Sequence, residues 1–293
     1  MVNRIAVIGA GGMGAWFTRF FKSRGDLVSV ADRDASKAKR LASKLRAEYA
    51  PSNVEAARRS DIVIIATPTR VTPKVIKEVL PALRDNALIC EISATKSIVV
   101  PALRDAGKRR VKIASIHPMF GPLAHGISER KIVAIRTGKD MRGYKTMRHL
   151  LQGARFLLTD QDTHDKNVAV TLGLPHFLNM AFAMTLCKRR DSAEIRRFAG
   201  RTFNLQMLLA QAIADEPETI ADIQITNEEF LRVMRDLQRD IRSLARIVNQ
   251  RDRARLVARY KKIRRTLATE RQFRIARRTF EKVTETQSAV SRR

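Results

Sequence analysis

The sequence has little cysteine, few aromatic residues and no long apolar run. Cys90 and Cys187 are its two cysteines, which argues against a disulfide-stapled fold, and we expect two free, buried thiols in a reducing compartment. Aromatic residues make up 5% of the chain, with Trp16 as the single tryptophan. No run of 18 apolar residues occurs and the N-terminus reads as a strand, so we expect no membrane span, no signal peptide and a cytoplasmic location.

Acidic residues are also scarce. The chain has 29 Asp and Glu against 57 Lys and Arg, a formal net charge of +28, and residues 251–293 hold 15 of the basic residues against 4 acidic ones. Such a field attracts small dianions, nucleic acid or acidic lipid. The apolar residues of this segment recur at roughly helical intervals. We therefore expect a helical extension that packs on the body of the protein, with only weak, non-specific affinity for nucleic acid.

Apolar residues make up 44% of the chain, enough for well-formed hydrophobic cores. Short, nearly continuous apolar runs in the first half alternate with stretches of helical spacing, which is the pattern of parallel strands buried on both faces. The runs cover residues 5–8, 27–31, 62–66, 88–90, 113–116 and 132–135.

The strand signal stops after residue 158. Residues 163–189, 193–214 and 227–250 carry apolar side chains three and four positions apart, as helices do. We predict an α/β domain with a mostly parallel sheet over residues 1–158. An all-α domain over residues 159–293 follows, which ends in the basic extension.

A glycine motif follows the first predicted strand and opens a helix. Gly9 permits a tight turn, Gly11 lets a pyrophosphate approach the backbone, and Gly14 allows close helix–strand packing; Gly12 and Met13 complete the loop. The free N–H groups of the helix N-terminus favour phosphate binding. These features predict a Rossmann domain that binds a nicotinamide dinucleotide.

Two further loops bear on the cofactor. Asp32 ends the second predicted strand, where a carboxylate accepts hydrogen bonds from the adenosine ribose and repels a 2′-phosphate, which favours NAD. Arg33 follows directly and leaves NADP possible. Thr67 and Pro68 follow the third predicted strand, at the edge of the sheet where ligands bind, and a backbone contact to the cofactor is expected there.

The remaining motifs resemble the prephenate dehydrogenase family, including its arogenate and cyclohexadienyl relatives. The strings follow one another in order from residue 5 to about residue 225. The most specific of them is His117-Pro-Met-Phe-Gly-Pro122. The others are Glu91-Ile-Ser-Ala-Thr-Lys96, His164-Asp-Lys-Asn-Val-Ala169, Leu174-Pro-His-Phe177 and Asp215-Glu-Pro-Glu-Thr-Ile-Ala-Asp-Ile223.

The resemblance implies an NAD-dependent oxidation of a dianionic cyclohexadienyl alcohol with loss of CO2, as in tyrosine biosynthesis. It implies that His117 engages the ring hydroxyl, as a neutral imidazole can at cytoplasmic pH, and that the helical half forms a homodimer. The expected substrate-binding residues are His164, Ser93, Thr95, Lys96, His176 and Gln211. No metal site is expected.

Two positions depart from the family pattern. Ala94 stands where the family has a serine paired with the catalytic histidine, and Gln211 stands where it has an arginine that binds a carboxylate. Another cation such as Lys96 or Arg201 can replace the arginine. Alternatively, the substrate is arogenate or another small carboxylate, or the protein has lost catalysis and its basic C-terminus binds nucleic acid.

Overall fold

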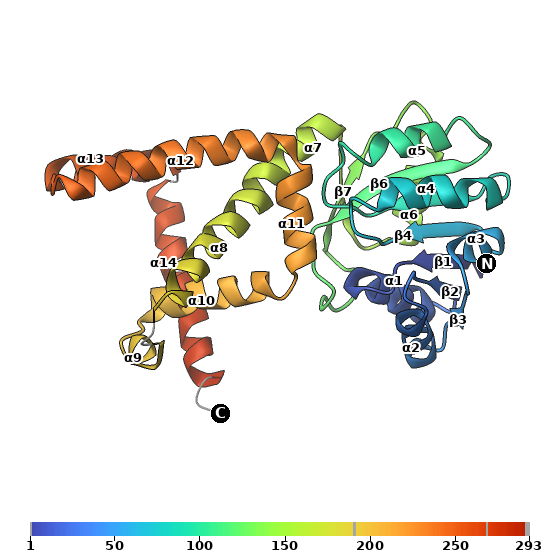
Figure 1. The fold of residues 1–293 in the computed structure, drawn as a ribbon, viewed down its shortest axis with the longest axis horizontal. Coiled ribbons are helices and arrows are strands. Elements are labelled where there is room, and N and C mark those ends of the chain that lie inside the picture. Colours follow the sequence, from blue (N-terminus) through green and yellow to red (C-terminus); the bar gives the residue numbers. More distant parts are fainter. Residues whose placement is uncertain (1, 190–191, 268, 291–293) are drawn as a thin grey trace. The chain divides into compact units, whose positions relative to one another are not determined.

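The computed structural model describes residues 2–189, 192–267 and 269–290, which form two compact units. The first unit consists of Met1–Gly173 and Glu218–Phe230, and the second of Leu174–Pro217 and Leu231–Arg293 (Figure 1). The boundary predicted at residue 158 falls at the end of the last strand. The first unit continues beyond that point and takes in one later helix as well.

An eight-stranded sheet forms the centre of the first unit. Its order is β3-β2-β1-β4-β5-β6-β7-β8, and every neighbouring pair is parallel except β6 and β7. The predicted fold class is confirmed, and each of the six predicted runs lies on a strand. The strands are β1 (Arg4–Ile8), β2 (Leu27–Ala31), β3 (Glu48–Tyr49), β4 (Ile62–Ile65), β5 (Leu88–Glu91), β6 (Lys112–Pro118), β7 (Lys131–Ile135) and β8 (Arg155–Thr159).

Local sequence signals set where the helices of this unit begin. Asp34 caps α2 by accepting a hydrogen bond from Lys37 N, and Asp160 caps α7 by accepting one from Thr163 N. The α-helices are α1 (Gly12–Ser23), α2 (Ala35–Leu45), α3 (Asn53–Arg58), α4 (Thr72–Val79), α5 (Val100–Ala106), α6 (Arg142–Leu150), α7 (Gln161–Val168) and α11 (Pro217–Thr226). Two other turns are the 3-10 helix η1 (Leu80–Ala82) and the π-helical η2 (Ala169–Gly173).

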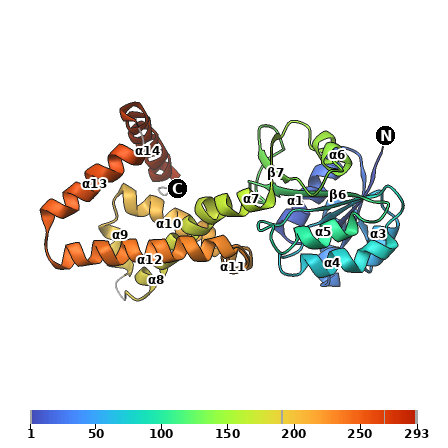
Figure 2. The ribbon, with the colours of Figure 1, turned by 90° about the horizontal axis from the view of Figure 1, so that it is seen from above.

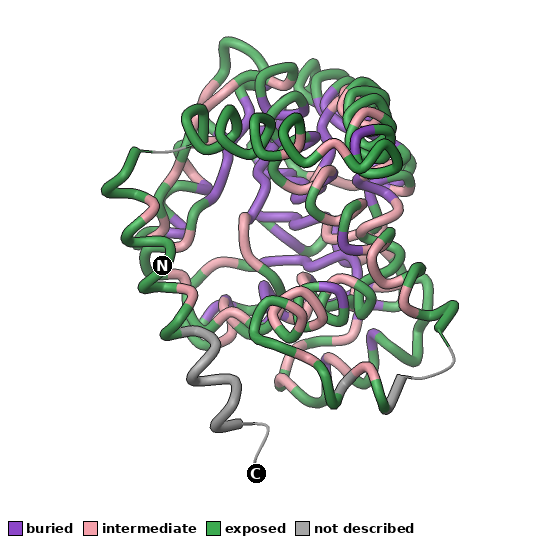
Figure 3. Tube along the Cα trace, turned by 90° about the vertical axis from the view of Figure 1, so that its left-hand side faces the viewer, coloured by how far each residue is buried: buried purple, intermediate pink, exposed green. Residues whose placement is uncertain are grey.

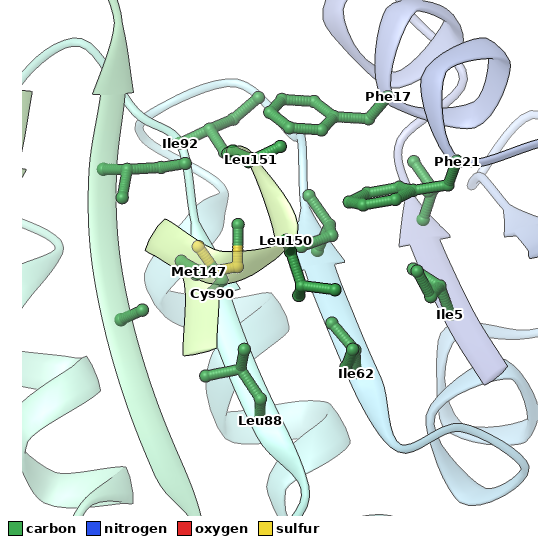
Figure 4. Close-up of a cluster of buried hydrophobic side chains, with 14 of the residues drawn as sticks. Ile5, Phe17, Phe21, Ile62, Leu88, Cys90, Ile92, Met147, Leu150 and Leu151 are labelled. Carbon is green, nitrogen blue, oxygen red and sulfur yellow. The ribbon is translucent and has the colours of Figure 1, made fainter. Parts of the chain in front are cut away.

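Two hydrophobic clusters cover the two faces of the sheet. One joins α1 and α6 to the strands, and Phe17, Phe21 and Met147 are labelled in it (Figure 4). The other joins α3, α4 and α5 to the opposite face (Figure 2). Buried positions therefore concentrate on the strands, while long stretches of helix are exposed (Figure 3). Because helices cover both faces of the sheet, a ligand can bind only at the edge where the strands end.

The second unit is helical. Its core contact joins α8 and α10, where Gln206 donates a hydrogen bond to Asn179 Oδ1 at 2.8 Å and the rings of Phe182 and Phe203 lie 5.9 Å apart. The chain from Gln161 to Cys187 is, by length and composition alone, apolar enough to span a membrane, which for one helix is weak evidence. The helices are α8 (Leu174–Cys187), α9 (Ser192–Arg197), α10 (Arg201–Ala214), α12 (Glu228–Asn249), α13 (Arg253–Leu267) and α14 (Glu270–Val290).

Two expectations about burial are wrong. Both cysteines are free, but Cys187 is exposed, because it lies in the last turn of α8 and no sheet covers that helix. The apolar residues of α13 do not form a buried face either, because Tyr260 is 66% exposed and Leu267 is 71% exposed, whereas α14 contacts α10 as expected for a packed extension. Basic residues occur all round α13, so this helix has no continuous apolar stripe to bury.

Candidate active site

The glycine loop brings β1, β4 and α1 into close contact. Gly9 has φ +109°, and a Cβ there would lie 2.4 Å from Ala66 O. A Cβ on Gly14 would lie 1.8 Å from Gly9 O. Both positions therefore require glycine, for the turn and for close packing. A Cβ on Gly11 would meet nothing within 4 Å, and α1 has no side-chain cap. The open N-terminus of α1 leaves backbone N–H groups for an anion.

A cavity of about 340 Å³ opens over this loop. Basic side chains of α2 line it together with the loop backbone: Lys37, Arg40 and Lys44. Asp32 stands at the end of β2, where it accepts hydrogen bonds from Ala10 N at 2.7 Å and Asp34 N at 2.8 Å, and Arg33 is exposed. An uncapped helix N-terminus, a glycine cradle and surrounding cations fit the pyrophosphate of a dinucleotide.

Hydroxyl groups join the loops that follow β4 and β5. Thr67 Oγ1 lies 2.9 Å from Thr72 Oγ1, and Ser93 Oγ donates to Thr72 Oγ1 at 3.4 Å. Pro68 is exposed, and its carbonyl accepts from the backbone of Thr72. The loop with Thr67 and Pro68 is thus fixed at the carboxyl edge of the sheet beside the loop with Ser93.

The string His117-Pro-Met-Phe-Gly-Pro122 ties the end of β6 to the glycine helix. The Phe120 ring lies 4.9 Å from the Trp16 ring of α1, and Trp16 donates a hydrogen bond to Ala124 O at 2.9 Å. A Cβ on Gly12 would lie 2.9 Å from Pro122 Cγ. These contacts join the segment that follows His117 to the glycine helix α1.

His117 begins a buried chain of hydrogen bonds. Its Nδ1 lies 3.0 Å from His164 Nε2, and His164 Nδ1 lies 2.7 Å from Asp165 Oδ1. The carboxylate of Asp165 also accepts from Lys96 N at 3.0 Å and from Ser97 N at 2.8 Å. The side chains of His164 and Asp165 are 1% and 5% exposed. Both ring nitrogens of His164, a residue expected at the substrate, therefore have protein partners.

The hydrogen bonds assign the protons of both rings. An ionised Asp165 can only accept, so Nδ1 of His164 carries the proton and its Nε2 accepts. Nδ1 of His117 must then be the donor of the pair, which leaves Nε2 of His117 as a lone pair. The His117 imidazole is therefore available as a base through Nε2. Its hydrogen bond to His164, which Asp165 holds in turn, fixes its orientation and its tautomer.

The surroundings keep both imidazoles neutral. Burial holds the pKa of His117 well below 6.5, and the charges of Lys96 and His164 act in the same direction. Burial also lowers the pKa of His164, although Asp165 opposes this effect. Burial by itself would raise the pKa of Asp165, but hydrogen bonds from His164, Lys96 N and Ser97 N outweigh it and keep this pKa below 3.8.

A fully buried ion pair lies behind these groups. Lys96 Nζ donates to Glu91 Oε1 at 2.8 Å and to Ile116 O at 2.7 Å, and neither side chain of the pair is exposed. Glu91 also accepts from Ser115 Oγ and from Ser93 N. Lys96 and the backbone of Ser93, both expected at the substrate, thus bond to protein groups. Thr95 is buried as well, and its Oγ1 has no hydrogen-bond partner in the described part of the chain.

Helix α11, which was not predicted, closes this group of residues. Asn227, directly after the helix, donates a hydrogen bond from Nδ2 to Asp165 O at 2.9 Å. One and a half turns earlier, Asp222 accepts from Arg70 Nε at 2.7 Å. Arg70 belongs to the loop after β4, where the sequence analysis had singled out only Thr67 and Pro68. The sequence offered one indication of Arg70: it is a basic residue in a loop that follows a predicted strand at the carboxyl edge of the sheet.

Two family models match this chain. Residues 17–133 match the family model "Prephenate dehydrogenase, nucleotide-binding domain", and residues 160–262 match "Prephenate dehydrogenase, dimerization domain". The chain belongs to the prephenate dehydrogenase family. The first match lies within the first unit, and the second runs from α7 of the first unit into the second unit as far as residue 262.

Individual relatives are distant. A probable arogenate/prephenate dehydrogenase of Methanocaldococcus jannaschii is 31% identical over 256 residues, which are 85% of this chain and 57% of that protein. A 4-amino-4-deoxyprephenate dehydrogenase of Streptomyces pristinaespiralis is 25% identical over 90% of each chain. The crystal structure of prephenate dehydrogenase from A. aeolicus, solved with hydroxyphenyl propionate and NAD+, has a TM-score of 0.74 at 18% identity, and covers 90% of this chain and 96% of its own. The chain therefore spans little more than half the length of its archaeal relative.

The remaining predicted residues of this family member lie in the second unit. His176 is half-buried on α8, burial lowers its pKa, and its Nδ1 has no hydrogen-bond partner among the described residues. Gln211 is exposed on α10. Arg201 forms an ion pair with Glu281 of α14. Within the described ranges, no three His, Cys, Asp or Glu side chains gather as metal ligands.

Proposed function

We propose that the chain catalyses the NAD-dependent oxidative decarboxylation of prephenate to 4-hydroxyphenylpyruvate. The observation that carries this proposal is the Asp165–His164–His117 chain, which leaves His117 Nε2 as a free acceptor at the carboxyl edge of the sheet. The open glycine loop begins at the same edge, three strands away from β6 in the strand order. An oriented base and a dinucleotide cradle at one edge of the sheet are what the oxidation of an alcohol requires.

The reaction divides simply between protein and substrate. His117 Nε2 accepts the proton of the ring hydroxyl as the carbinol C–H bond breaks. A nicotinamide cofactor held at the glycine loop would supply the acceptor for the two electrons of that bond, which leave as hydride. The bond between the ring and its carboxylate then breaks, and its electrons complete the aromatic ring as CO2 leaves. The protein therefore needs to supply one base, cationic groups for the carboxylates and a dry site.

Hydrogen bonds from behind offset part of the cost of charging His117, whose pKa its surroundings lower. As His117 becomes an imidazolium, its Nδ1–H bond to His164 strengthens, and His164 in turn is held by the ionised Asp165. Asp165 keeps its negative charge throughout, as a carboxylate behind a catalytic histidine does. The low pKa of His117 returns the proton readily once the product has formed.

We propose NAD as the cofactor because Asp32 stands at the end of β2, where its carboxylate would repel a 2′-phosphate. Arg33 and the basic side chains of α2 keep NADP as the alternative. We also propose a cytoplasmic homodimer that forms through the helical unit, with no specific nucleic-acid role. The match to a dimerization-domain model supports the homodimer.

Initial rates of NADH or NADPH formation test this function. Prephenate and arogenate are each offered with NAD and with NADP. The proposal predicts the highest kcat/KM for prephenate with NAD. A preference for arogenate would change the substrate within the same family, and no turnover of either compound with either cofactor would overturn the function.

A further inference from the structure

Arg70 is held in place by a buried carboxylate. Its Nε donates to Asp222 Oδ1 at 2.7 Å, and the two side chains are 66% and 5% exposed. The other oxygen of Asp222 is enclosed and has no hydrogen-bond partner among the described residues. The terminal nitrogens of the guanidinium meet no carboxylate in the described part of the chain. One edge of the guanidinium is thus fixed by the protein, and the opposite edge is free to bind an anion.

Arg70 and His117 lie at the same edge of the sheet in the first unit. Arg70 lies in the loop after β4, and His117 is the next-to-last residue of β6. Only β5 separates the two strands, so the strand ends lie about 10 Å apart at the usual strand spacing. Asp222 lies five residues before Asn227, about 7.5 Å along a helix, and Asn227 bonds to Asp165 of the histidine chain. A small dicarboxylate can span such a separation.

The other cations considered for this role are already paired. Lys96 is fully buried against Glu91 and Ile116 O. Arg201 pairs with Glu281 in the second unit. Gln211 carries no charge. A dianionic substrate therefore still needs a cation, and the carboxyl edge of the sheet offers Arg70.

We propose that Arg70 binds a carboxylate of the substrate and that Asp222 is the positioning residue that orients it. This proposal rests on the proposed function, because it takes its ligand from that reaction. Asp222 fixes the plane of the guanidinium, so that the two terminal N–H groups face a carboxylate together. Asp222 also belongs to the helix that Asn227 ties to Asp165, so the anion site and the base are coupled through α11.

Steady-state kinetics on three variants of the full chain measures this role. Arg70→Gln raises KM for the cyclohexadienyl substrate about 10- to 100-fold, the size of a lost charge-assisted contact, while the Kd of NADH stays unchanged. Arg70→Lys recovers part of the loss, because it keeps the charge without the paired donors. Arg59→Gln is the matched control, since Arg59 is also exposed and bonded to a carboxylate, Glu55, on the far side of β4. An unchanged KM in Arg70→Gln, or an equal rise in Arg59→Gln, overturns the proposal.

A binding measurement tests the carboxylate contact of Arg70 independently of catalytic turnover. Calorimetry compares 4-hydroxyphenylpropionate with its neutral amide, on wild type and on Arg70→Gln, in the presence of NADH. The proposal predicts that the acid loses affinity in the variant and that the amide does not. Equal losses for acid and amide contradict a carboxylate contact, and a raised NADH Kd assigns Arg70 to the cofactor instead. If wild type binds the acid selectively through Arg70 but turns over no cyclohexadienyl substrate, the proposed function fails and the anion site stands.

Discussion

The residue that defines this site is a histidine with a second histidine behind it. His117 Nδ1 bonds to His164, so the base is oriented without the hydroxyl that the family places at the position of Ala94. The imidazole–imidazole contact fixes the tautomer only because Asp165 fixes the other end. The hydrogen-bond partner of His117 thus comes from α7 and not from the loop that contains Ala94.

Removing the negative charge of Asp165 tests the tautomers assigned to His164 and His117. Asp165→Asn is expected to lower kcat by about 10²-fold or more with little change in the Kd of NADH, because an amide can donate to His164 Nδ1 and reverse both rings. Stopped-flow or initial-rate measurements give kcat. Asp160→Asn, a change of the exposed cap of the same helix, is the control. Full activity in Asp165→Asn contradicts the assigned tautomers.

The low pKa values of the histidines also link stability to pH. The folded protein holds His117 and His164 neutral below the ordinary pKa of 6.5, whereas the unfolded chain protonates them there. Their contribution is complete above pH 6.5 and is lost as the pH falls from 6.5 towards the lowered values. We expect the free energy of unfolding to fall between pH 7.5 and pH 5.5, and less so in His117→Asn than in the exposed-residue control His149→Asn. Urea titrations at both pH values measure this, and equal slopes in the two variants would count against it.

Individual residues were partly predictable. His117 could be recognised because a distinctive string follows a strand. The contact between His164 and His117 could not be recognised, because 47 residues separate them and no local pattern encodes it. Lys96 was expected at the substrate because it is charged, but its burial against Glu91 depends on the tertiary packing of β5 and β6. The same limit applies to Arg70 and Asp222, which are 152 residues apart.

At the scale of elements, buried strands were predicted well and edge strands poorly. Central strands read as apolar runs because helices cover both of their faces. Strand β3 has only two residues, and β8 alternates in exposure at the edge of the sheet, so neither gave a run. The antiparallel pairing of β7 left no local signature. Helix α11 was missed because its sequence was interpreted as a family string rather than as an element.

The junction of β1 and α1 makes a prediction at this scale. Gly14→Ala would place a Cβ 1.8 Å from Gly9 O, so α1 must move off β1. We expect a loss of about 1–3 kcal/mol in the free energy of unfolding, together with weaker NAD binding, because the phosphate cradle moves with the helix. Thermal denaturation and NADH fluorescence measure the two effects. Gly138→Ala, where a Cβ meets nothing within 4 Å, should change neither, and a Gly14→Ala protein with wild-type NAD affinity would refute the account.

At the scale of the molecule, the second unit exposes many apolar side chains. Met184 on α8 and Leu208 and Leu209 on α10 are 59%, 48% and 46% exposed. Exposed apolar surface of this extent marks an interface. The family model that matches this unit describes a dimerization domain, so a second copy of the chain is the partner that we expect.

Introducing charged residues on the exposed apolar surface of α10 should dissociate the expected dimer. Light scattering at micromolar concentration is expected to give a dimer for wild type and a shift towards monomer for the double change Leu208→Glu and Leu209→Glu, because burying two carboxylates without partners is costly. Leu157→Glu, on the 54% exposed Leu157 of β8, controls for a new surface charge. A monomeric wild type would contradict the proposed assembly.

The stoichiometry of the products shows whether the enzyme couples hydride transfer to decarboxylation. Prephenate carrying deuterium at the carbinol carbon is turned over with NAD, and the NADH and CO2 released are measured together. The account predicts one CO2 for each NADH, with the deuterium in the NADH, and a rate lower by about 10²-fold or more in His117→Asn, the usual size for loss of a general base. NADH formed without CO2, or a His117→Asn variant that turns over at the wild-type rate, would contradict it.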